Sequence, residues 1–247
     1  MFSASLYDLI GKPVEERYGR FEGRVVAVET KPTREVSAIV YENGGVLIKS
    51  NTSSFRFNGT SVVLAPSIIF EAEELCEEMD IHLVQQQAAS NLKIKGLVSE
   101  EIINEVKDEL DAAFEAISAK AEELTQKLNE RLLHTNEKRN WIYRLFMNLE
   151  VARNMNLLKD DGYSQAHKKL EEEKSHIHNE IEDIERLTAK ISSTLNKIKE
   201  LRAEKEETES PFPHAIVEPE TPPKEPETVE IVEEIEEEVG ETPPGIA

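Results

Sequence analysis

The stretch from Glu71 to Glu206 contains no proline and only two glycines, Gly96 and Gly162. Proline and glycine are the residues that most often interrupt helices, and the apolar residues of this stretch recur three and four positions apart. One helix is predicted from Glu71 to Lys95, ending near Gly96. About sixty further helical residues would be roughly 90 Å long, which is too long for a compact globule of this size.

The helical stretch divides again at Asp160-Asp161-Gly162, with Ser99 as candidate N-cap of a helix to about Lys159 and Ser164 as candidate N-cap of the last helix. In that last helix an apolar column repeats every seven residues, which is typical of a coiled coil. Its members are Leu170, Ile177, Ile184, Ile191 and Ile198.

The alternate positions of this seam are less regular, since Ile181 and Leu195 fill some of them and Lys174, Thr188 and Arg202 interrupt them. This mixture does not match the preference of a parallel two-stranded coil. We therefore predict a coiled-coil hairpin over 71–206, turning near 160–163 and associating with other copies as a dimer or filament. A monomeric hairpin with one solvated face is the alternative.

The first seventy residues have a different pattern, with short β-branched runs separated by turn signals. Asn43-Gly44-Gly45 and Asn58-Gly59 favour hairpins, and the second is predicted to be a type I′ turn. Five or six short antiparallel strands most economically close into a small barrel. The sequence as a whole predicts an α+β chain: a β-barrel at 1–70, a helical coiled coil at 71–206 and a tail.

The tail at 207–247 has thirteen glutamates against one lysine, and eight of the eleven prolines. Such a composition predicts disorder. One island at 229–239 nevertheless keeps five β-branched residues, namely Val229, Ile231, Val232, Ile235 and Val239. We interpret the island as a partner-binding motif. Its pattern fits either a strand or a helix in the bound state. A merely solubilising tail is the alternative, and a shorter apolar patch at 214–217 could share the contact.

The charge, the cysteine content and the motifs of the chain limit the kinds of functional site that it can form. The formal net charge is −21, and the single Cys76 allows neither an intramolecular disulfide nor a thiolate metal cage. No basic targeting segment or apolar span stands out, so a cytoplasmic protein is expected. No catalytic motif is present, and His176 and His178 lack further ligands and are expected to face solvent. We predict no enzyme activity, no cofactor and no metal site.

One stretch, from Arg131 to Lys159, is locally basic, with six basic and two acidic residues. Within it Lys138, Arg139 and Arg144 are candidate contacts for an anionic partner, either a membrane surface or DNA. In the alternative interpretation the neighbouring aromatic residues are core, and the cations pair with Glu171 to Glu173.

The start of the chain, Leu9-Ile10-Gly11-Lys12-Pro13-Val14 followed by Gly19-Arg20-Phe21-Glu22-Gly23-Arg24-Val25-Val26-Ala27-Val28, resembles the opening of a PRC-barrel, with Gly11, Gly19 and Gly23 serving turns. A PRC-like barrel, a long coiled coil and a Pro/Glu tail with a terminal motif, in this order, resemble the CdvA family of archaeal cell-division proteins.

This resemblance implies a cytoplasmic scaffold that assembles into filaments at the division site, on the inner face of the cell membrane. It also implies that the tail recruits the ESCRT-III-like protein CdvB by adding a strand to its winged-helix domain, and residues 229–239 match that role. The rival interpretation is a nucleic-acid-associated PRC-barrel coiled-coil protein, in which the barrel or the basic stretch grips RNA or DNA.

Overall fold

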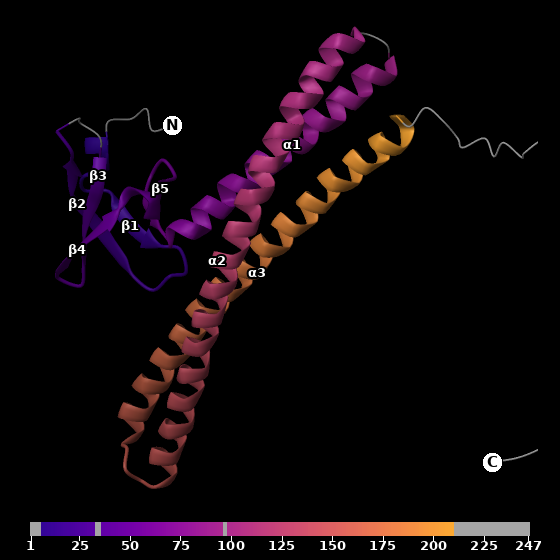
Figure 1. Cartoon of the computed structure of the whole chain (residues 1–247). Helices are drawn as coiled ribbons and strands as arrows, with labels where there is room; N and C mark the ends of the chain where they lie inside the picture. Colours follow the sequence, from indigo (N-terminus) through magenta and orange to yellow (C-terminus); the bar gives the residue numbers. More distant parts are fainter. Residues whose placement is uncertain (1–5, 33–35, 96–97, 210–247) are drawn as a thin grey trace, which may run out of the picture. The chain divides into compact units, whose positions relative to one another are not determined.

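The computed structural model describes residues 6–32, 36–95 and 98–209. A β-domain comes first and three long helices follow, so the predicted α+β class is confirmed (Figure 1). The motif predicted at 229–239 lies outside the described residues.

The β-domain is one six-stranded sheet with the strand order β4-β3-β2-β1-β6-β5. Its strands are β1 (Pro13–Glu16), β2 (Glu22–Thr30), β3 (Val36–Asn43), β4 (Val46–Asn51), β5 (Phe55–Phe57) and β6 (Val62–Leu64). Neighbouring strands are antiparallel as predicted, except that β1 and β6 are parallel. Since every other pairing is antiparallel, β4 and β5 run in the same direction within the sheet.

The sheet curls around its own core into a half-barrel, and β4 and β5 form its two edges. No β4–β5 ladder is present in the described sheet, so the expected barrel is not fully closed. A short 3-10 helix, η2 (Thr52–Ser54), connects these two strands. The core of the half-barrel consists of Leu9, Val14, Val25, Ile39, Tyr41, Phe55 and Val62.

The two predicted hairpins are both present, but their turns differ. Gly44 and Gly45 join β3 to β4 with φ values of 58° and 82°, as a two-residue turn requires. The β5–β6 connection has four residues, 58–61, and of the Asn-Gly pair only Gly59 has a positive φ. The type I′ prediction is wrong here because the Asn58 side chain accepts hydrogen bonds from the backbone N–H groups of Thr60 and Ser61 and widens the turn.

Two of the three glycines of the N-terminal motif lie in turns, since Gly11 and Gly19 have φ values of 82° and 85°. Gly23 instead lies within β2, so the prediction of a turn there is wrong. A Cβ atom at this position would lie 2.1 Å from the backbone oxygen of Glu42. Gly23 is therefore required by the close approach of β2 and β3.

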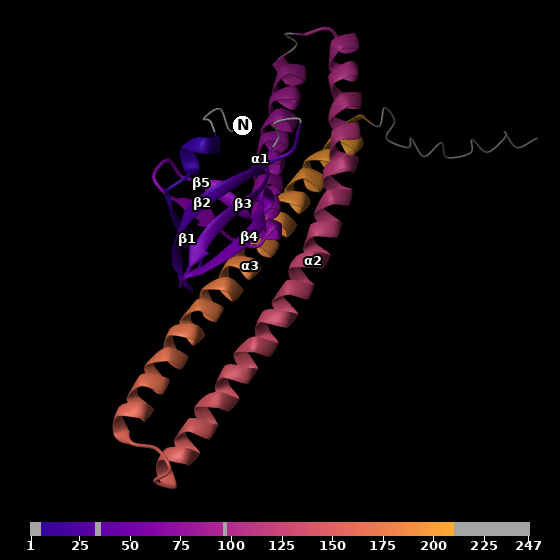
Figure 2. The ribbon, with the colours of Figure 1, turned by 90° about the vertical axis from the view of Figure 1, so that its left-hand side faces the viewer.

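The helices are α1 (Ser67–Lys95), α2 (Glu100–Asn154) and α3 (Asp160–Glu209). α2 and α3 form the predicted hairpin, and α1 packs against both of them (Figure 2). Their shared core includes Leu75 and Met79 of α1, Leu124 and Leu128 of α2, and Leu187 of α3. The hairpin thus becomes a three-helix bundle next to the half-barrel.

The turn between α2 and α3 lies at 155–159, a few residues before the predicted position. Asn156 adopts the left-handed conformation, with a φ of 55°, which asparagine tolerates better than most residues. Gly162, predicted to make the turn, lies inside α3, and so does Ser164. Among the described helices, none has the length and apolarity needed to span a bilayer.

Candidate functional site

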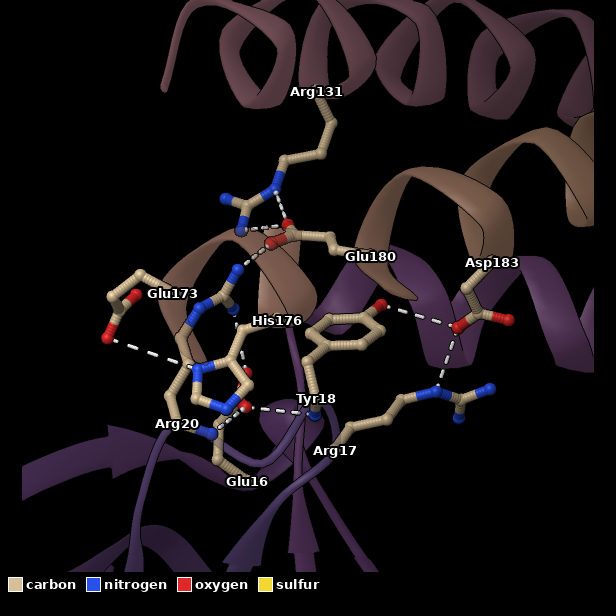
Figure 3. Close-up of polar contacts among 9 residues, drawn as sticks. All are labelled: Glu16, Arg17, Tyr18, Arg20, Arg131, Glu173, His176, Glu180 and Asp183. Atoms are coloured by element: carbon tan, nitrogen blue, oxygen red, sulfur yellow. Dashed lines mark hydrogen bonds and ion pairs between the residues drawn. The ribbon is translucent and has the colours of Figure 1, made fainter. Parts of the chain in front are cut away.

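A polar junction connects the half-barrel to all three helices. Figure 3 shows its contacts with α2 and α3. The turn between β1 and β2 presents Arg17, Tyr18 and Arg20, and Gly19 gives this turn its positive φ of 85°. The junction consists of Glu16, Arg17, Tyr18, Arg20, Glu73, Arg131, Glu180 and Asp183.

Its first branch is a chain of alternating charges. Arg20 donates to Glu16 Oε1 from Nη1 at 2.9 Å and to Glu180 from Nη2. Arg131 of α2 donates to Glu180 Oε1 from Nε at 2.7 Å. Glu16 Oε2 also accepts from the backbone N–H groups of Tyr18 and Arg20, at 2.9 and 3.1 Å. These bonds fix the turn onto the end of β1 and join it to α2 and α3.

The second branch links the same turn to α1. Arg17 bonds Glu73 of α1 from Nη2 at 2.7 Å and Asp183 of α3 from Nε at 2.8 Å. The Tyr18 hydroxyl donates to Asp183 Oδ2 at 3.3 Å. Arg17 therefore bridges two helices that start far apart in the sequence.

The junction is largely withdrawn from water, since the side chains of Glu180 and Glu16 are 1% and 7% exposed. Burial alone would raise the pKa of Glu180, but its hydrogen bonds and charge interactions with Arg20 and Arg131 outweigh burial and lower the pKa. Burial, together with the negative charges of Asp183 and Glu180, raises the pKa of Tyr18. Glu180 is thus held ionised and Tyr18 neutral.

This arrangement holds elements together and offers no free acid, base or nucleophile. Every charge of the junction has an opposite partner within hydrogen-bonding distance. In the part of the chain that the structure describes, no cluster of three His, Cys, Asp or Glu residues could hold a metal ion. The ion pairs and hydrogen bonds of the junction thus have a structural role, which is to hold the half-barrel against the helical bundle.

The two histidines flanking Ile177 have different environments. His178 is 64% exposed and lies 3.2 Å from Glu182. His176 packs over Gly19 and its side chain is only 16% exposed, so the prediction that it faces solvent is wrong. The reason is that the half-barrel covers this flank of α3.

The predicted seam of α3 lies in the interior of the helical part. Ile177 packs with Ile142 near the hairpin end, and Leu170 is half-buried beside it. Ile184, Ile191 and Ile198 belong to the core shared by the three helices. In this protomer the seam is covered by α2 and α1.

The predicted anionic-partner residues lie on the half of α2 nearest the hairpin turn. Lys138 and Arg144 are exposed, Arg139 is half-buried, and none of the three forms an ion pair with a described residue. The alternative pairing with Glu171 to Glu173 is wrong, because those glutamates face residues of their own helix. Glu171 pairs with Lys174, Glu172 pairs with Lys169, and Glu173 lies 3.9 Å from His176.

The sequence interpretation missed the polar junction, although it contained one signal. Glu180 lies three residues after Ile177 and four before Ile184, so it shares the face of the helix that carries the buried seam. A charged residue at such a position requires a partner. The partner Arg20 lies 160 residues away in the sequence, so the pattern could indicate a contact without identifying it.

Comparison with known families bears on the helical part of the chain. The family model described as a CdvA-like coiled-coil domain matches residues 69–212, which is more than half of the 247 residues. The chain belongs to the CdvA family. No curated protein and no solved structure gives a significant match. Because the match begins at residue 69, it covers the three helices, and the PRC-barrel resemblance of the β-domain stays a prediction.

The CdvA family is a structural family with a general role in cell division. Most of the described chain consists of long helices that share one buried core, as expected of a structural protein.

Proposed function

We propose that this CdvA-family protein is a non-enzymatic scaffold of archaeal cell division, which self-assembles into filaments and recruits ESCRT-III-like CdvB through its C-terminal tail. The observation that carries the proposal is the helical part matched by the family, in which α2 and α3 have 55 and 50 residues. Helices of this length, about 83 and 75 Å at 1.5 Å per residue, provide long lateral surfaces for assembly.

The polar junction supports a scaffold role. It fixes the half-barrel to three helices at once, so that the folded part of each copy can be added to an assembly as one unit. The tail motif has the composition of a segment that orders on a partner, and repeated copies along a filament would add avidity to weak single contacts.

The tail assignment is tested by deleting residues 229–239 and measuring binding to the CdvB winged-helix domain by titration calorimetry. We expect the deletion to abolish binding while sedimentation of the assembled protein stays unchanged. A second deletion, of residues 214–217, tests whether the shorter apolar patch shares the contact, and binding should be retained if 229–239 alone makes it. Binding that survives loss of 229–239 would remove recruitment from that segment.

We further propose that the scaffold works in the cytoplasm at the inner face of the cell membrane at the division site. The exposed cations Lys138 and Arg144 lack ion pairs among the described residues and are available to an anionic surface. Charge reversal at Lys138, Arg139 and Arg144 should then reduce co-sedimentation with anionic vesicles. The rival function, nucleic-acid association, predicts instead that the same variant loses binding to duplex DNA. Unchanged binding to both would exclude lipid and DNA as partners of these cations.

A further inference from the structure

The charges of α2 are divided between its two halves. From Glu100 to Glu130 the helix has ten acidic and three basic residues, and from Arg131 to Asn154 it has five basic and two acidic residues. Such a helix is electrostatically complementary to a second copy of itself in the antiparallel direction. A parallel neighbour would place like charges beside each other.

The outward face of α2 carries an exposed stripe at the spacing of a second seam. Its members recur three and four residues apart, on the side away from the core. The stripe consists of Glu122, Gln126, Asn129, Leu133, Glu137, Asn140, Arg144, Met147 and Val151. Toward the hairpin turn its apolar members Leu133, Met147 and Val151 are 64%, 69% and 54% exposed. This half of the stripe also carries one acidic and one basic residue, Glu137 and Arg144.

On one flank of the acidic half, α2 and α3 enclose an open groove of about 630 Å³. Ala121 and Thr125 of α2 and Ile191 and Leu195 of α3 line it, and Leu133 closes one end. The groove thus begins where the apolar half of the stripe begins.

We propose that α2 is the self-association surface of this protein, packing antiparallel against α2 of a second copy about a two-fold axis at Leu133. The inference rests on the proposed self-assembly and specifies the contact that it uses. Arg144 lies eleven residues after Leu133 and Glu122 eleven before it, so the axis brings Arg144 of each copy beside Glu122 and Glu123 of the other. Such a contact is isologous, because both copies use the same surface, and each charged pair therefore occurs twice.

The same axis places Tyr143, ten residues beyond Leu133, at the level of the partner's groove between Ala121 and Thr125. At about 100° per residue, Tyr143 and Thr125 lie on the same side of the seam through Leu133. The two-fold axis therefore brings Tyr143 to the side of the partner helix on which the groove lies. Tyr143 is 48% exposed in the single copy and is the aromatic side chain suited to fill that groove. The basic half of α2 therefore has an anionic partner in the acidic half of the next copy.

The test uses two charge variants of the full chain, Arg144→Glu and the double variant Glu122→Arg, Glu123→Arg. Each alone should associate about tenfold more weakly or worse by sedimentation equilibrium, because both symmetric contacts become repulsive. An equimolar mixture should regain wild-type association, since both contacts are attractive in the heterodimer. Lys197→Glu, at an exposed position of α3, is the matched control and should change nothing. Tyr143→Ala should weaken association at least tenfold.

Cross-linking tests the axis itself. In a Cys76→Ala background, Leu133→Cys should form a disulfide-linked dimer under mild oxidation, because a residue at the axis faces its own copy. Lys197→Cys should not. Far-ultraviolet circular dichroism confirms that each variant is folded.

Two outcomes would overturn the proposal. If the chain assembles but Leu133→Cys gives no covalent dimer and Arg144→Glu has no effect, assembly uses another surface and only this inference fails. If Arg144→Glu loses binding to anionic vesicles or DNA and the mixture does not restore association, the cations serve a lipid or a nucleic acid instead. Tail-dependent binding of CdvB is independent of both results.

Discussion

Removing the carboxylate of Glu180 should be among the most damaging single changes in the described structure. The side chain is 1% exposed and binds both Arg20 and Arg131, whose side chains are 25% and 29% exposed. In Glu180→Ala the two guanidinium groups would face each other across the space that the carboxylate left. Breaking one side of a buried ion pair costs about 3 to 5 kcal/mol.

The structure places this variant near the lower end of that range. Arg20 keeps its bond to Glu16 at 2.9 Å, and both arginines reach some solvent. Arg131 has Glu180 as its ion-pair partner and would be left without one among the described residues. We therefore expect the free energy of unfolding to fall by about 3 kcal/mol.

Urea denaturation followed by circular dichroism measures this loss. With a slope of about 2 kcal/mol per molar urea, the midpoint should move down by about 1.5 M. Glu182→Ala is the matched control, because Glu182 lies on the same helix and is 64% exposed beside His178. Equal midpoints for the two variants would refute the view that the junction stabilises the fold.

Three further predictions concern the same fold. The lowered pKa of Glu180 means that its stabilisation is present above the ordinary value of 4.5 and is lost as the pH falls through the lowered pKa, so Glu180→Gln should flatten the acid-side decline of stability measured in urea. Leu75→Ala, at a fully buried site of α1, should cost about 2 to 5 kcal/mol in the same assay, and a loss below 1 kcal/mol would argue against α1 as part of the core. Gly23→Ala should disturb the amide exchange of β2 and β3, because the new Cβ meets the Glu42 oxygen, whereas Gly11→Ala should cost only about 1 to 2 kcal/mol for its φ of 82°. Equal exchange in the two glycine variants would contradict the close approach.

The helical part was predictable because its signals are local. Scarcity of Gly and Pro and the seven-residue repeat of Ile177, Ile184 and Ile191 predicted long helices, and the structure buries that repeat. The turn was misplaced because Gly162 is a stronger general signal than Asn156, although Asn156 adopts the left-handed conformation.

The packing of α1 was not predicted, since a helix that contacts two neighbours and also buries His82 and Gln86 lacks a clean apolar stripe. The polar junction was beyond sequence reasoning for a different reason. Arg17, Arg20, Glu180 and Asp183 are common residue types, and only the fold brings them together.

The long sequence separation across the polar junction bears on the order in which the chain folds. Arg17 and Arg20 meet their partners on α3, Asp183 and Glu180, only after residue 183 has been synthesised, whereas the strands of the half-barrel are complete at Leu64. Because domains generally fold as units during synthesis, we expect the half-barrel to form first, with these arginines still in water. Docking onto α3 would then be a late event, so a chain truncated before Asp160 should keep its sheet and the contact of Arg17 with Glu73 of α1, while it loses the ion pairs with Glu180 and Asp183.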